Sequence, residues 1–171
     1  MPITPFHLIA GSSLKVIAPR YFSWVTFALT NILIDLEPIT LYLITLNPGH
    51  EFFHTIVGAT IIAILVATVG RRPCELLLDL WNNDLKGKER LWLSVNSNIS
   101  KTSSWIGAIT GAWTHLFLDS LMHDDIRPLW PFSDVNHLVG SIEISMLHTI
   151  LSAVGIVGVL CLVIGRRFFT K

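Results

Sequence analysis

Histidine and aspartate recur at helical spacing in two parts of the chain. His115, Asp119 and His123 follow one another at intervals of four residues in a segment that is otherwise apolar or small, so on a helix they form one polar stripe. His50 and His54 are also four residues apart and share a face if a helix begins by His50. Because imidazole nitrogens and carboxylate oxygens are ligands for zinc, manganese and iron, this spacing indicates a metal site.

The segments around these side chains are strongly apolar. Of the 171 residues, 51% are hydrophobic and only 14% are charged, against about 25% charged residues in a soluble domain. An ionisable side chain inside a membrane segment costs about 2.5–3.5 kcal/mol on insertion scales, so it is retained where it pairs, binds an ion or lines a wet cavity. The side chains of this kind are Asp35, Glu37, His54, His115, Asp119, Glu143 and His148, and His7 lies close by.

Four stretches approach the length of about 20 apolar residues that a bilayer-spanning helix needs. Within the first stretch, Pro38 is expected to break the helix, because proline removes a backbone donor and clashes with the preceding turn. A short helix is predicted from Pro5 to Val16. The fold class predicted is an all-α, polytopic membrane bundle formed by a single domain, residues 1–171. We predict its four spans near residues 21–46, 52–69, 105–122 and 138–165.

Basic residues are concentrated between the second and third predicted spans. The segment 71–104 holds six Lys and Arg residues, whereas the segments 47–51 and 123–137 together hold one, Arg127. Positive residues beside membrane segments favour the cytoplasmic side. We therefore expect 71–104 to be a cytoplasmic loop, and the other two segments to lie on the outer face. The zero net charge and the lack of a strongly basic patch exclude a nucleic-acid partner.

The N-terminal helix is expected to bring a further histidine, His7, to about the same depth in the membrane as Asp35. If the chain turns at Ala18, His7 lies about 17 Å before the turn, while Asp35 lies about 20 Å after Phe22. For His148, a metal ligand and a hydrogen bond to a serine or carbonyl on a neighbouring helix are equally good explanations of its position in a membrane segment. The metal ligands predicted from the residues alone are His7, Asp35, His54, His115 and Asp119.

A metal bound by these groups lowers the pKa of a bound water towards neutrality, and so supplies a nucleophile for ester or phosphoester hydrolysis. Asp35 or Glu37 would act as the general base, and Arg127 would neutralise a phosphate. The expected cofactor is a divalent metal, zinc, as one or two ions, and the expected substrate is a membrane lipid or a lipid-linked molecule. Two alternatives stay open: transport of metal ions or protons along the polar stripe, and b-type haem bound by two histidines.

Several short motifs together resemble the bacterial membrane-bound metal-dependent hydrolases, which include the LexA-regulated inner-membrane hydrolases. In that family an arginine follows the first histidine of the third motif, where Glu51 stands here. The resemblance implies a hydrolase of the bacterial inner membrane. The motifs are MPITPFH at 1–7, IDLEP at 34–38, HEFFHT at 50–55, HLFLD at 115–119 and PFS at 131–133.

A weaker similarity extends to zinc phospholipase C and P1 nuclease, helical proteins with three zinc ions. The shared feature is the order His, Asp, His and then HxxxD. This similarity implies the same five ligands and adds His123 as a sixth. The chain lacks the closing HxxxE pair and the N-terminal Trp of that pattern, so one or two ions are expected instead of three.

Overall fold

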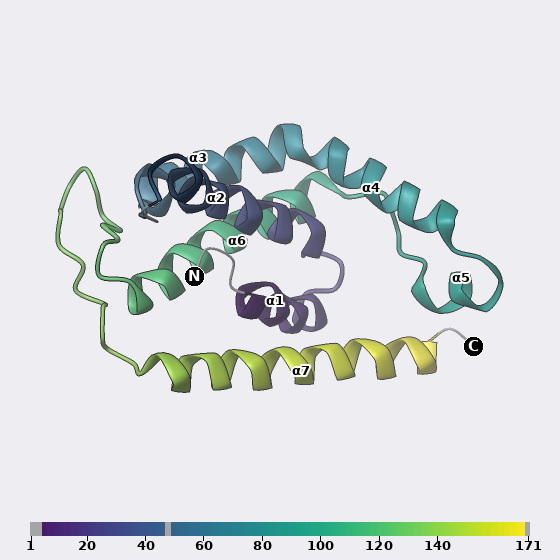
Figure 1. Ribbon diagram of the computed structural model, residues 1–171. Helices are drawn as coiled ribbons and strands as arrows, with labels where there is room; N and C mark the ends of the chain where they lie inside the picture. The colour runs from purple at the N-terminus through teal and green to yellow at the C-terminus, as the bar shows by residue number, and fades with distance from the viewer. Residues whose placement is uncertain (1–4, 47–48, 170–171) are drawn as a thin grey trace.

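The computed structural model describes the backbone of residues 5–46 and 49–169, together with the side chains of residues 6–46 and 49–165. The first four residues of the N-terminal motif and Asn47 of an expected outer loop lie outside these ranges. All regular structure in the described residues is helical, as predicted (Figure 1). The elements are α1 (Pro5–Ile17), α2 (Trp24–Thr45), the 3-10 turn η1 (Phe52–His54), α3 (Ile56–Leu65), the π-helical segment η2 (Val66–Gly70), α4 (Arg71–Asp84), α5 (Gly87–Leu93), α6 (Lys101–Met122) and α7 (Ile144–Phe169).

Helix α2 continues through its proline. Ser23 precedes its first turn and caps the backbone N–H of Thr26 with its side chain, and Leu46 follows its last turn in a left-handed conformation. The prediction that Pro38 breaks this helix is therefore wrong. Proline inside a helix costs about 3 kcal/mol, but Pro38 is buried and α2 packs along α6, so tertiary packing holds the helix together. Asp35 consequently stays on a continuous helix that faces α6.

Helix α6 lies at the centre of the bundle, where it packs against α2 and α3, while α1 packs mainly against α7 (Figure 1). The core between α2, α3 and α6 is built from small and branched side chains. A Cβ at Gly111 of α6 would lie 2.9 Å from the backbone oxygen of Phe27, so glycine lets the backbones of α6 and α2 approach closely. The buried core includes Ile34, Ala59, Ala63, Val66, Ala108 and Ala112.

Two of the described helices, α2 and α7, are long and apolar enough to cross a membrane, so the prediction of four spans is not confirmed. The second predicted span consists of η1 followed by α3 and η2, and these two continue directly into α4, because the backbone stays right-handed helical at Val66, Gly70 and Arg71. Helix α6 has 22 residues, but polar side chains such as Lys101, His115 and Asp119 lower its hydropathy. The fourth predicted span begins at Ile144, later than expected.

The basic residues of 71–104 and the polar end of α6 lie at opposite ends of the bundle. The segment 71–104, predicted to be a cytoplasmic loop, forms α4, α5 and the first turn of α6. Figure 1 shows α4 and α5 at the end of the bundle opposite the long loop that joins α6 to α7. Because α6 runs from Lys101 towards that loop, Asp119 lies near the loop end and the basic residues of 71–104 lie near the other.

Candidate metal centre

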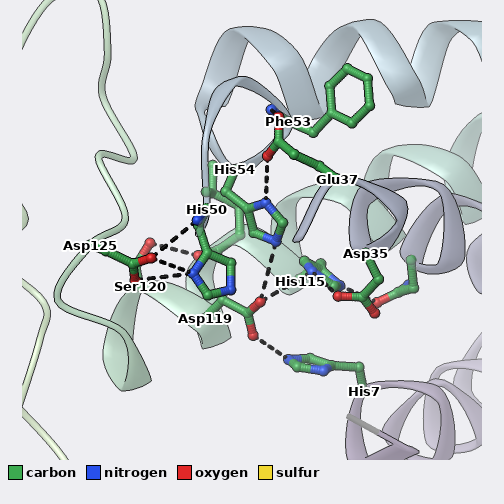
Figure 2. Close-up of polar contacts among 12 residues, drawn as sticks. His7, Asp35, Glu37, His50, Phe53, His54, His115, Asp119, Ser120 and Asp125 are labelled. Atoms are coloured by element: carbon green, nitrogen blue, oxygen red, sulfur yellow. Dashed lines mark hydrogen bonds and ion pairs between the residues drawn. The ribbon is translucent and has the colours of Figure 1, made fainter. Parts of the chain in front are cut away.

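Five ionisable side chains from four elements converge inside the bundle (Figure 2). His7 comes from α1, Asp35 from α2, His54 from η1, and both His115 and Asp119 from α6, and all five are buried. One ligand atom from each of Asp35, His54, His115 and Asp119 lies within 4.8 Å of the others. The structure thus brings together the five residues predicted from the sequence, and four of them could surround one ion.

Asp119 is the shared contact of the histidines (Figure 2). Its Oδ2 lies 3.2 Å from Nε2 of His115 and 3.6 Å from Nε2 of His54, and its Oδ1 lies 3.2 Å from Nε2 of His7. Oδ1 of Asp35 lies 3.5 Å from Nε2 of His115. None of these three Nε2 atoms has a hydrogen-bond partner within the described part of the chain.

The tautomer of His115 follows from its neighbour on α2. The side-chain amide of Asn31 donates to the backbone oxygen of Phe27 at 2.8 Å, which fixes its orientation. Oδ1 of Asn31 therefore accepts the hydrogen bond from Nδ1 of His115 at 2.9 Å. Because Nδ1 carries the proton, Nε2 of His115 presents a lone pair to the two carboxylates.

Glu37 gives His54 the same tautomer. Nδ1 of His54 lies 3.0 Å from Oε2 of Glu37, and a carboxylate can only accept, so Nδ1 carries a proton; in the neutral imidazole that would bind a metal, Nε2 then has the lone pair. Glu37 also accepts the backbone N–H groups of Phe53 at 2.8 Å and Glu51 at 3.0 Å. A Cβ at Gly58 would collide with the carbonyl of Phe52, so glycine at the start of α3 allows the turn that holds His54.

Lone pairs and carboxylates that face one another in a buried site repel unless a cation lies between them. A single proton would satisfy one of these contacts, whereas a divalent metal would satisfy all four ligand atoms together. The carboxylate–imidazole pair of Glu37 and His54 is a common outer partner of metal-binding histidines. The residues present therefore fit a divalent metal such as zinc. His7, whose ring stacks on His115 at 4.9 Å, lies beside this set.

Removing the outer partner of His115 tests this arrangement. We expect Asn31→Leu to weaken metal affinity about 10–100-fold, because Nδ1 loses its acceptor and the tautomer is no longer fixed. Asn31→Asp, which retains an acceptor, should lose less. Competition titration of the purified chain against a chromophoric chelator measures both, and equal affinity of Asn31→Leu and the wild type would contradict the assignment.

The prediction that His123 continues the stripe of α6 is wrong. Helix α6 ends at Met122 and the backbone of His123 is extended, with φ −119° and ψ 128°. Its ring instead packs on that of His50, with centroids 4.4 Å apart. His50, His123 and Asp125 form a second group whose ligand atoms lie within 4.8 Å of one another. His50 and His54 share no helix either, because α3 begins only at Ile56.

A pocket of about 980 Å³ opens beside this second group, and its lining includes His50, His123, Asp125 and Arg127. Burial, reinforced by the charge of His50, lowers the pKa of His123. Burial opposes ionisation of Asp125, but hydrogen bonds from His50 outweigh it and hold the pKa of this carboxyl below its usual value. Arg127 lies 3.5 Å from Asp134, and both side chains are largely exposed.

Two other ionisable side chains singled out in the sequence, His148 and Glu143, lie outside both groups of ligands. The ring of His148 stacks on Phe6 with centroids 4.4 Å apart, and Glu143 accepts a hydrogen bond from Ser145. Asn31 was missed from the sequence, whereas Asp125, which follows His123 in a loop, was predicted to be a surface residue or an outer partner of a ligand. A signal for Asn31 existed, because an amide four residues before Asp35 shares its helix face within an apolar segment.

The sequence model of the YdjM inner membrane protein family matches residues 8–170. The chain belongs to the YdjM inner membrane protein family. Membership in this family and the two apolar helices support a membrane location. The matched segment includes Asp35, His54, His115 and Asp119, while His7 immediately precedes it. No curated protein and no solved structure matches the chain significantly.

Proposed function

We propose that this member of the YdjM family is a metal-dependent hydrolase of an ester or phosphoester, acting on a membrane lipid or a lipid-linked substrate. The observation that supports this best is the convergence of two imidazole lone pairs, on His54 and His115, with the carboxylates of Asp35 and Asp119. A divalent metal bound there would lower the pKa of a bound water and supply the nucleophile.

The chain's own groups then divide the work. Asp35 lies among the ligand atoms, 3.5 Å from His115, and would take the proton of the nucleophile. Glu37 accepts three hydrogen bonds, so its role is to orient His54; this replaces its expected role as a base. Arg127, on the wall of the pocket, would contact a phosphate after release from Asp134.

The pocket suits a substrate that comes from the membrane. Trp130 and Phe52 line it and their rings meet edge to face at 6.2 Å, while the side chain of Phe132 in the same loop is 84% exposed. Aromatic side chains of this kind favour the membrane–water interface. With the basic segment 71–104 in the cytoplasm, a multi-pass chain would place this pocket at the outer face of the inner membrane.

The alternatives fit the geometry less well. Haem bound between His54 and His115 would need the space that the carboxylates of Asp35 and Asp119 occupy. Transport of ions needs a polar path from the metal centre to the end of the bundle that holds α4 and α5. Towards that end, the hydroxyls of Thr30 and Ser104 donate to backbone carbonyls, so they offer no chain of exchangeable ligands.

Hydrolysis is tested on the full chain purified in detergent. The metal-loaded protein is expected to cleave at least one of a chromogenic phosphate ester, a carboxylate ester and phospholipid in mixed micelles. Activity should disappear with chelator and with Asp35→Asn, and should return only for the wild type when Zn²⁺ or Mn²⁺ is added. His137→Ala, a change at an exposed loop histidine, serves as control. A metal-loaded chain that cleaves none of these substrates, but moves metal ions into liposomes, would replace hydrolysis by transport.

A further inference from the structure

A second set of ligands lies beside the buried centre. His50 precedes η1, whereas His123 and Asp125 follow α6, yet one ligand atom from each lies within 4.8 Å of the others. The ring centroid of His50 lies 4.4 Å from that of His123 and 4.6 Å from that of His54. The second group is thus adjacent to the first and lies between it and the pocket.

Hydrogen bonds hold both sides of this group in place. Asp125 accepts the backbone N–H of His50 at 3.1 Å and its Nδ1–H at 2.9 Å. In the neutral imidazole, Nε2 of His50 then has a lone pair available to a metal, as Nε2 of His54 does beside Glu37. The side-chain amide of Asn136 donates to the backbone oxygen of His123 at 3.1 Å, which ties the loop to the end of α6. These side chains are positioned before any ligand binds.

The charge of the pocket gives a reason for a cation here. Glu51, Asp124, Asp125 and Asp134 line it, against one cationic side chain, Arg127, which is already paired with Asp134. An anionic ester would be repelled by this lining. A divalent ion on the two imidazoles and Asp125 would offset the carboxylates where such a substrate must enter.

We propose that His50, His123 and Asp125 bind a second divalent metal ion at the floor of the pocket, next to the buried centre. The proposal that this ion binds rests only on the positions of these three side chains. Its consequence for the substrate rests on the proposed hydrolase function: two neighbouring ions can stabilise both the attacking and the leaving oxygen of a displacement at phosphorus, which favours a phosphoester over a carboxylate ester.

Metal stoichiometry tests the proposal on the full chain in detergent. Stripped protein is dialysed against Zn²⁺ or Mn²⁺, and bound metal is counted by mass spectrometry. We expect two ions per chain for the wild type and for His137→Ala, and one for His123→Ala and for Asp125→Asn. Asp125 is 44% exposed, so its substitution keeps the test informative if His123→Ala fails to fold.

Electron paramagnetic resonance gives a second readout that does not depend on activity. The Mn²⁺-loaded wild type should show a spectrum broadened by a neighbouring ion, and His123→Ala the narrower spectrum of an isolated ion. A wild type that saturates at one ion, or a folded His123→Ala that retains two, overturns the second site. Two ions without hydrolysis would remove the proposed function and leave this site standing, whereas hydrolysis with one ion would do the reverse.

Discussion

Asp119→Asn is expected to abolish metal binding at the buried centre. The substitution keeps the size of the side chain but removes the charge of the one carboxylate that contacts His7, His54 and His115. The loss of affinity should exceed the about 10–100-fold that removal of an outer partner causes. Hydrolysis of any substrate that the wild type cleaves should fall to the background rate.

The matched control for this substitution is Asp84→Asn, because Asp84 is an exposed residue at the end of α4. Elemental analysis of both variants, purified alongside the wild type, measures the effect. We expect the control to retain the metal content of the wild type. An Asp119→Asn chain that is folded and holds as much tightly bound metal as its control would show that the ion lies elsewhere.

Chelation is expected to destabilise the wild type and to leave Asp119→Asn unchanged. An ion that binds only the folded chain adds about 2.7 kcal/mol to the free energy of unfolding at a concentration 100 times its dissociation constant. Without the ion, the buried carboxylates of Asp35 and Asp119 face each other and the lone pairs of the histidines. Asp119→Asn removes one of these two like charges.

With Zn²⁺ the wild type should unfold at a higher temperature than Asp119→Asn. Chelator should narrow this difference, because without the ion Asp119 retains only its contacts with the three histidines and faces the like charge of Asp35. Thermal unfolding followed by circular dichroism in one detergent, with each additive in turn, measures both midpoints. If chelator fails to lower the midpoint of the wild type, the cluster is held together by protons and not by a metal.

Periodicity within one helix was enough to predict part of the site. His115 and Asp119 lie four residues apart on α6, and a polar stripe on an apolar helix must point inwards. The same reasoning failed for His123, because it cannot locate a helix end: α6 stops at Met122 and the extended backbone turns the ring towards His50. A difference of one residue in a boundary moved this histidine from the first group to the second.

Residues outside long helices depended on tertiary contacts that spacing does not reveal. His54 sits in a 3-10 turn that Glu37 holds by accepting two backbone N–H groups. Four membrane spans were predicted from apolar composition, and two of the described helices meet the length and hydropathy of a span, so the other two are not confirmed. Pro38 was misjudged because local preference was allowed to outweigh the packing of α2 on α6.

The most direct test of the central claim is the metal content of the full chain. Detergent-purified wild type, equilibrated with Zn²⁺, Mn²⁺ or Fe²⁺ and then passed through a desalting column, should retain at least one ion per chain. X-ray absorption of that ion should show only nitrogen and oxygen ligands, with the scattering pattern of imidazole, because Asp35, His54, His115 and Asp119 supply the donor atoms. A correctly folded chain that retains no metal under any of these conditions would contradict the account.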